Sequence, residues 1–280
     1  MGWRIRVVHE TGYRYGSPVH ESYNEVRLTP RSDARQNVVV SRVETTPPTR
    51  SYRYSDYWGT TVTSFDLHAP HTELAVTATS VVETAAPRPA PPDVGWDTLA
   101  DPRVLDEFSE LLAPSRYVVA EEEVDAVARD LRAAGSPRET GRAAVQWVHE
   151  HLDYVRGVTS VGTTSAEARA LGQGVCQDFT HLALALLRSA GLPARYVSGY
   201  LHPGRDAPLD EPVSAESHAW VEFWAGAWTP LDPSSLAEVA ERHVLVARGR
   251  DYSDVRPLAG IYSGPAAESL GVTVELTRLR

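Results

Sequence analysis

Cys176, His218 and Asp232 are residue types that together could carry out acyl transfer, and they follow one another in that order along the chain. A cysteine thiolate attacks a carbonyl carbon, an imidazole moves the proton, and a carboxylate fixes the tautomer of the imidazole and stabilises its charged form. Cys176 is the only cysteine among 280 residues, so any thiol chemistry belongs to it. Since a lone cysteine is more often a small inert side chain, the functional interpretation depends on the histidine and the aspartate.

Cys176 lies in the segment Gly174-Val-Cys-Gln-Asp-Phe-Thr-His181, where a glycine-marked loop runs into an apolar helix. The helix is predicted over residues 175–190 and is ended by Gly191 and Pro193. A helix start offers unpaired backbone N–H groups and the positive end of the helix dipole, which favour a thiolate. We therefore predict that Cys176 is a nucleophile in the first turn of this helix.

His218 lies in a predicted strand over residues 217–224 whose two faces differ. Strand alternation places His218, Trp220 and Glu222 on one face. The apolar residues between them form the other face, which we predict to be the core face. The strand therefore predicts that His218 points away from the core.

A second predicted strand brings Asp232 to the same face as His218. A three-residue hairpin loop would pair Trp224 with Trp228 and place Asp232 opposite Trp220. Asp232 then lies diagonally from His218, roughly 7 to 8 Å away between backbones, a span that the two side chains can close. This register predicts a His218–Asp232 pair, and a slip of one residue would separate the two side chains.

Acyl transfer also needs hydrogen-bond donors for the oxyanion, and the backbone N–H of Cys176 is the obvious candidate. Gln173 and Tyr154 are candidates for a second donor, and the sequence does not choose between them. Gln177, beside the nucleophile, could line the substrate cleft or cap the helix. Trp220 could form a wall of the acyl site or pack as an ordinary aromatic side chain.

Other polar residues near these segments are predicted to be structural. Asp178 is placed to cap the helix start, and His181 is interpreted as a hydrogen-bonded structural histidine. Two histidine pairs lack the spacing and the acidic or thiolate partners of a metal site: His149 with His151, and His68 with His71. We expect no metal and no organic cofactor.

The order of the predicted elements indicates an α+β protein with more than one domain. Residues 1–85 contain β-branched runs bounded by turn residues, which predict an antiparallel β-sandwich. Residues 86–95 are rich in proline, which suits an interdomain linker. Residues 96–280 are predicted to form a core of helices packed on an antiparallel sheet. The predicted helices span 120–134, 175–190 and a segment starting at Pro137, and the predicted strands span 4–9, 38–44, 74–83, 194–201, 217–224, 228–232, 243–247 and 271–276.

The composition excludes some partners. The formal net charge of −10 argues against a nucleic-acid or anionic-membrane surface, because backbone phosphates need basic patches. No stretch approaches the roughly 18 apolar residues of a membrane helix, and one cysteine allows no internal disulfide. We expect a cytoplasmic protein. All 27 basic residues are arginine, so the chain has no ε-amine with which to crosslink itself.

Residues 174–201 resemble the nucleophile region of the bacterial transglutaminase-like family, whose fold is related to that of papain-like cysteine proteases. Ser217-His-Ala-Trp-Val-Glu222 and Pro230-Leu-Asp-Pro-Ser234 resemble the histidine and aspartate segments of the family. Residues 249–262 resemble a signature found late in these proteins, and residues 1–85 resemble the β-rich domain that often precedes this core. In three places family members often carry other residues, none of them catalytic: Thr60, Thr180 and Ser234-Ser235.

The resemblance implies that Cys176 is the nucleophile, His218 the base and Asp232 the third member of a triad. It implies a papain-like/transglutaminase-like core that attacks a peptide or protein amide and forms a thioester. If water resolves the thioester, the enzyme is a protease or amidase. If an amine resolves it, the enzyme is a protein-glutamine acyltransferase. The alternative is a non-catalytic binding or assembly module that retains the fold. A redox sensor is less favoured, because no second cysteine is present to resolve an oxidised thiol.

Overall fold

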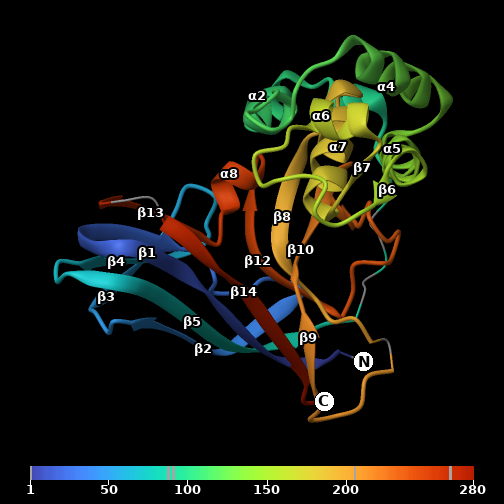
Figure 1. Cartoon of the computed structure of the whole chain (residues 1–280). Helices are drawn as coiled ribbons and strands as arrows, with labels where there is room; N and C mark the ends of the chain where they lie inside the picture. The colour runs from blue at the N-terminus through green and yellow to red at the C-terminus, as the bar shows by residue number, and fades with distance from the viewer. Residues whose placement is uncertain (1, 87–88, 90–91, 205, 265–266) are drawn as a thin grey trace.

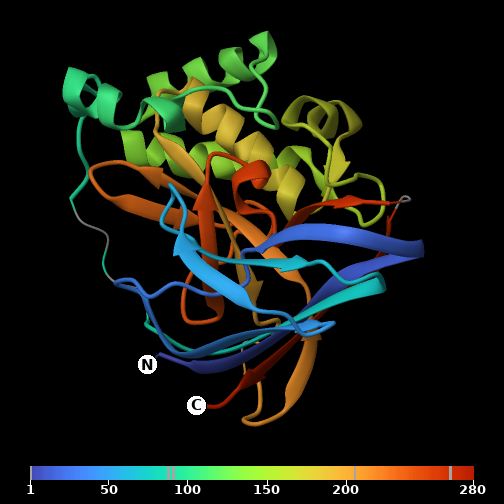
Figure 2. The ribbon, with the colours of Figure 1, turned by 90° about the vertical axis from the view of Figure 1, so that its left-hand side faces the viewer.

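Helices and strands occupy different regions of the molecule (Figure 1). The computed structural model describes residues 2–86, 89, 92–204, 206–264 and 267–280. Most helices gather beside a sheet of four strands, and a larger antiparallel sheet lies at the other end (Figure 2). The α+β class is as predicted.

The strands of the described chain are β1 (Arg4–Val26), β2 (Gln36–Thr46), β3 (Ser51–Ser55), β4 (Thr61–Leu67), β5 (His71–Thr84), β6 (Asp153–Tyr154), β7 (Gln173–Gly174), β8 (Ala194–Leu201), β9 (Pro212–Ala215), β10 (Ser217–Trp224), β11 (Trp228–Leu231), β12 (His243–Gly249), β13 (Leu258–Ser263) and β14 (Ala267–Arg278). Its helices are α1 (Trp96–Leu99), α2 (Pro102–Glu107), α3 (Ser109–Leu112), α4 (Glu122–Ala134), α5 (Pro137–His151), α6 (Ser165–Leu171), α7 (Cys176–Ser189) and α8 (Tyr252–Val255).

The larger sheet is organised by β1, which is much longer than the strand predicted over residues 4–9. The first half of β1 pairs with β5 and β14, and the second half pairs with β4 and β13. The two parts of the sheet that β1 connects enclose an apolar cluster that includes Phe65, Leu74 and Val76. The N-terminal region is therefore antiparallel and β-rich, as predicted.

Strands from both ends of the chain share this larger sheet. β14 pairs with β1, and β9 pairs with β14. The two termini meet there, because the backbone N–H of Leu279 donates to the carbonyl of Arg4 at 2.7 Å. The division into residues 1–85, 86–95 and 96–280 stays a prediction. Residues 87, 88, 90 and 91 of the predicted linker lie outside the described residues.

The smaller sheet has the strand order β11-β10-β8-β12, and α7 packs against it. β8 and β10 have the predicted bounds. Ala219, Val221 and Phe223, the predicted core face of β10, belong to the largest apolar cluster together with much of α7. Ile5 and Val82 of the larger sheet belong to the same cluster, so the two regions share one apolar core.

The three helices that the sequence predicted, α4, α5 and α7, begin close to the predicted residues, whereas α1, α2, α3, α6 and α8 were not predicted. α4 ends before Gly135, and α5 begins with a capping box in which Ser136 and Glu139 each bind the other's backbone N–H. None of the helices in the described part of the chain is long and apolar enough to cross a membrane.

Polar contacts join the larger sheet to the smaller one. The Gln36 side chain donates to the carbonyl of Leu245 at 2.7 Å and accepts from the N–H of the same residue at 2.8 Å. Arg248 of β12 donates to Asp33 at 2.9 Å and to the buried carboxylate of Glu222. These contacts fix β12 against the segment that precedes β2.

Candidate active site

Cys176 is the first residue of α7, as predicted. Its side chain is half-buried against the main apolar cluster. The first N–H groups of a helix have no acceptor inside the helix, so the backbone N–H of Cys176 is available to another acceptor. The helix start therefore places a thiol and an N–H donor at one point.

Asp178 fixes the loop that leads into α7. Its carboxylate accepts the backbone N–H of Val175 at 2.8 Å and the hydroxyl of Thr159 at 2.7 Å. A Cβ at Gly174 would lie 2.6 Å from the Cβ of Asp178, so this close approach requires a glycine. The predicted capping role of Asp178 is confirmed.

The hairpin of β10 and β11 sets the position of Asp232 relative to His218. Trp224 pairs with Trp228 and Val221 pairs with Leu231, which is the predicted register. Asp232 follows β11 directly, and its Oδ2 accepts a hydrogen bond from His218 Nε2 at 2.8 Å. The predicted His218–Asp232 pair is confirmed.

Two serines hold the carboxylate of Asp232 from the other side. Oδ1 accepts the backbone N–H of Ser234 at 3.0 Å and its hydroxyl at 2.8 Å. Oδ2 accepts the hydroxyl of Ser235 at 2.6 Å. The turn after β11 thus fixes both carboxylate oxygens before the imidazole binds one of them.

The charges of the pair stabilise each other. Burial alone would lower the pKa of His218, but its hydrogen bonds with Asp232 and Cys176 raise it to about 10. Burial would raise the pKa of Asp232, but its hydrogen bond with His218 is foremost among the contacts that hold this pKa well below its usual range. Since Nε2 of His218 binds Asp232, Nδ1 is the nitrogen left for Cys176. The structure thus brings together the three residues that the sequence singled out.

His243 is a second histidine beside Asp232 that the sequence did not single out. It is buried, and its Nε2 lies 3.9 Å from Asp232 Oδ2, too far for a hydrogen bond. The backbone N–H of Ala240 donates to His243 Nδ1 at 3.3 Å, so the neutral ring carries its proton on Nε2. Strand alternation indicated β12 but gave no pairing register that would bring His243 to the site.

His218, Asp232 and His243 offer nitrogen and oxygen atoms within 4.8 Å of one another, a donor set that divalent metals accept. Nε2 of both histidines faces Asp232. His218 Nε2 donates a hydrogen bond to the carboxylate, and the N–H of Ala240 keeps the proton of the neutral His243 ring on Nε2. A metal would have to displace both protons. The geometry therefore favours a hydrogen-bonded pair over a metal centre.

Three of the predicted cleft residues lie on elements next to Cys176. Tyr154 of β6 is partly exposed; burial raises the pKa of its hydroxyl, and the nearby Cys176 and Glu216 add to the rise. Gln173 lies in β7, which pairs with β6. Gln177 is in the first turn of α7 and donates to the carbonyl of Val161 at 3.2 Å. The Gln177 side chain thus ties a loop to the helix start.

Trp220 is 1% exposed and packs in a small apolar cluster with Val197 and Leu245. Its ring centroid is 6.1 Å from that of His218. This is the placement of a packed aromatic side chain, one of the two interpretations that the sequence allowed.

Four other histidines named in the sequence analysis bind backbone groups. His181 Nε2 accepts the N–H of Tyr252 at 3.2 Å, its ring stacks on Tyr117, and burial lowers its pKa to about 3, which confirms the structural role. Hydrogen bonds to carbonyl oxygens hold three more: His149 to Pro233, His151 to Trp147 and His71 to Ala69.

Family models match both regions of the chain. Residues 5–83 match the bacterial transglutaminase-like N-terminal region, and residues 125–233 match the transglutaminase-like superfamily. The second match spans Cys176, His218 and Asp232. A protein of Pseudomonas aeruginosa named protein-glutamine gamma-glutamyltransferase is 30% identical over 119 residues, which cover 39% of this chain and 18% of that protein.

Whole-length relatives carry the same two regions. An uncharacterized protein of Mycobacterium leprae is 52% identical and covers 99% of both chains. An uncharacterized protein of Mycobacterium tuberculosis is 32% identical, over 98% of this chain and 92% of that one. A solved structure from Cytophaga hutchinsonii, described as a "Putative Cysteine Protease", has a TM-score of 0.80 at 21% identity, over 100% of this chain and 92% of that one, which shows the shared fold. The chain therefore belongs to the bacterial transglutaminase-like family.

Proposed function

We propose that this protein is a cysteine-dependent acyl-transfer enzyme that acts on peptide or protein amides through a thioester on Cys176. The observation that carries the proposal is the contact chain of Cys176, His218 and Asp232. A buried carboxylate binds one nitrogen of the imidazole, and the thiol at a helix start interacts with the other. This is the arrangement that nucleophilic catalysis by cysteine requires.

The first step joins the sulfur to the substrate carbonyl carbon. The thiol proton passes to His218, Sγ of Cys176 attacks, and the carbonyl oxygen becomes an oxyanion that accepts the backbone N–H of Cys176. His218 then gives the proton to the leaving nitrogen, the C–N bond breaks, and an amine or ammonia departs. Asp232 stabilises the imidazolium throughout this step.

The second step resolves the thioester, and His218 changes role between the two steps. Cys176 is one of the groups that raise the pKa of His218. Acylation converts the thiolate to a neutral thioester, which removes that contribution and lowers the pKa of the imidazole. The neutral ring then accepts a proton from water or from an amine as either attacks.

The substrate class is proposed from the chemistry of the cleft and the name of one relative. The P. aeruginosa relative bears the name of an enzyme that acts on protein glutamine, which makes a glutaminyl side chain the first amide to test. Because the chain has no lysine, the amine would come from another molecule. A cytoplasmic location and the three-part domain division remain predictions within this proposal.

A glutaminyl-peptide assay tests the proposal. Wild-type protein is incubated with a library of glutaminyl peptides, with and without a fluorescent primary amine, beside a Cys176→Ser control. We expect ammonia release that depends on Cys176. Amine incorporation would identify a transferase, and release of glutamyl product alone would identify a hydrolase. Equal release by wild type and Cys176→Ser would reject the proposal, and a non-catalytic module predicts no release by either.

A further inference from the structure

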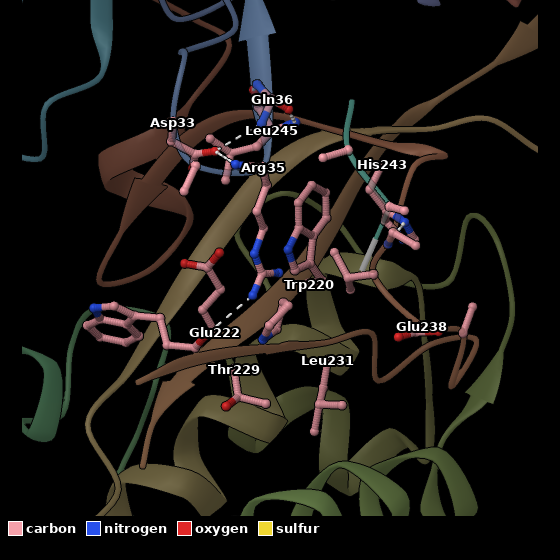
Figure 3. A pocket seen from close by; sticks show the side chains of 18 of the residues that line it. Asp33, Arg35, Gln36, Trp220, Glu222, Thr229, Leu231, Glu238, His243 and Leu245 are labelled. Carbon is pink, nitrogen blue, oxygen red and sulfur yellow. Dashed lines mark hydrogen bonds between the residues drawn. The ribbon is translucent and has the colours of Figure 1, made fainter. Parts of the chain in front are cut away.

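A cavity of about 700 Å³ lies between the smaller sheet and the segment that precedes β2 (Figure 3). Its lining includes Arg35 from that segment, Trp220 from β10 and His243 from β12. Cys176 and His218 are not among the lining residues that the structure describes. The volume falls within the range of roughly 300 to 1,000 Å³ that small-molecule sites occupy. The cavity is thus separate from the thiol of the active site.

Two buried donors in the cavity lining have no hydrogen-bond partner among the described residues. Trp220 Nε1 and His243 Nε2 are buried and make no hydrogen bond with another described residue, although His243 Nε2 faces the Asp232 carboxylate at 3.9 Å. An indole nitrogen can only donate, and Ala240 fixes the proton of His243 on Nε2. A buried donor left unpaired is unfavourable, so a ligand that accepts a hydrogen bond from it removes this penalty on binding.

Among the charged residues of the described lining, two arginines and one carboxylate, Glu238, have no ion-pair partner, which leaves an excess of positive charge. Asp33 and Glu222 form ion pairs with Arg248, and Glu222 also pairs with Arg195. Neither Arg35 nor Arg142 forms an ion pair with any described residue. Among the described residues, the side chain of Arg35 donates only to the carbonyl of Trp228, at 3.4 Å, and it runs beside the Trp220 indole in Figure 3.

The remaining walls are largely apolar. They are formed mainly by side chains of β11, of the loop after it and of β12: Trp228, Pro230, Leu231, Leu236, Val239 and Leu245. A ligand that fills the cavity must therefore have an apolar body, while Trp220 and Arg35, which lie side by side in Figure 3, both donate hydrogen bonds. A carboxylate presents only acceptors and carries the complementary charge.

We propose that this cavity binds a small-molecule carboxylate with an apolar body, whose oxygens accept hydrogen bonds from Trp220 Nε1 and Arg35. The site does not depend on the proposed acyl transfer, because Trp220 and Arg35 are not members of the proposed triad. His243 connects the cavity to the Asp232 carboxylate, 3.9 Å from its Nε2. A bound carboxylate would therefore lie close to the back of the catalytic pair.

The test uses full-length, ¹⁵N-labelled protein whose Cys176 has been alkylated, so that the thiol cleft is blocked. 4-Phenylbutyrate, octanoate and indole-3-acetate are titrated in turn, with 4-phenylbutan-1-ol as the uncharged control. The readout is the indole ¹H–¹⁵N signal of Trp220, identified by its loss in Trp220→Phe. We expect a saturable shift with at least one carboxylate and none with the alcohol.

Calorimetry on variants locates the site. Arg35→Gln and Trp220→Phe should each weaken carboxylate binding about 10-fold, the effect of losing one strong hydrogen bond. Arg6→Gln, an exposed arginine of β1, should leave binding unchanged. Three results would overturn the proposal: no shift of the Trp220 signal with any of the three carboxylates, equal binding of the alcohol, or equal affinity in Arg35→Gln and wild type. The comparison of the carboxylates with the alcohol is made by calorimetry on protein with no substitution and does not require a variant to fold.

Discussion

At the scale of single residues, the site depends on how firmly Asp232 is held. Its two oxygens accept hydrogen bonds from Ser234, Ser235 and His218, so the carboxylate cannot turn away from the imidazole. An imidazole bound in this way has one tautomer and one orientation. The remaining nitrogen of His218, Nδ1, is therefore the one that exchanges a proton with Cys176.

Replacement of Asp232 by asparagine tests this arrangement. Asp232→Asn keeps the size of the side chain but removes the charge that raises the pKa of His218, and its amide can favour the wrong tautomer. We expect turnover of any amide substrate to fall on the order of 10² to 10⁴-fold, as for other triads. Steady-state kinetics measure the effect. Ser235→Ala, which removes one hydrogen bond and no charge, should cost much less, and equal losses in the two variants would argue against the charge.

At the scale of elements, the start of α7 and the β10–β11 hairpin place the three residues. Asp178 binds both the residue before the helix and Thr159 of the loop beside it. The register of the β10–β11 hairpin holds His218 and Asp232 side by side. Its three-residue turn fixes which residues of the two strands are paired. Each element thus positions a catalytic group through local contacts.

Asp178→Ala should loosen the start of α7. It removes the acceptor for the Val175 N–H and leaves the Thr159 hydroxyl without its partner, so we expect a loss of about 1 to 2 kcal/mol in unfolding free energy. Urea unfolding measures the loss, and Asp178→Asn, which keeps an acceptor oxygen, is the matched control. A fully stable Asp178→Ala protein would show that the cap does not hold the helix start.

These local contacts are also the part of the site that the sequence predicts best. Glycine and apolar spacing placed Cys176 at the helix start, and the three-residue turn placed Asp232 beside His218. Strand alternation cannot identify partners distant in sequence, so the pairing of β14 with β1 could not be predicted. For the same reason the sequence did not place His243 next to Asp232, or Trp220 in a cavity behind the hairpin.

At the scale of the whole molecule, one apolar core spans the two sheets and carries several buried ionisable groups. Burial lowers the pKa of His9 to about 4 and that of His181 to about 3. His218 shifts the other way, to about 10, because its hydrogen bonds outweigh burial. The stability of the fold must therefore depend on pH in two opposite directions.

We predict that the unfolding free energy is highest near neutral pH. A buried histidine whose pKa lies below the unfolded value of about 6.5 contributes fully above that pH, and its contribution is lost as the pH falls. The shift of His9 alone corresponds to about 3 kcal/mol by pH 4. The contribution of His218 is complete below about pH 6.5 and is lost as the pH rises towards 10.

Urea unfolding at about pH 5, 7 and 9.5 measures both effects. His9→Gln should reduce the loss between pH 7 and 5, since it removes one of the groups that must take up a proton on unfolding. His68→Gln, an exposed position, is the control. A stability that rises steadily from pH 5 to 9.5 would contradict the raised pKa of His218.

The central claim is that Cys176 is a nucleophile activated by His218 and Asp232, and the rate of its alkylation by iodoacetamide tests this most directly. The measurement needs no substrate, and the single cysteine makes every labelled molecule unambiguous. We predict that Cys176 reacts faster at neutral pH than a free cysteine, and that His218→Ala slows it about 10-fold or more. Slow labelling with the pH dependence of an ordinary thiol, unchanged in His218→Ala, would contradict the claim.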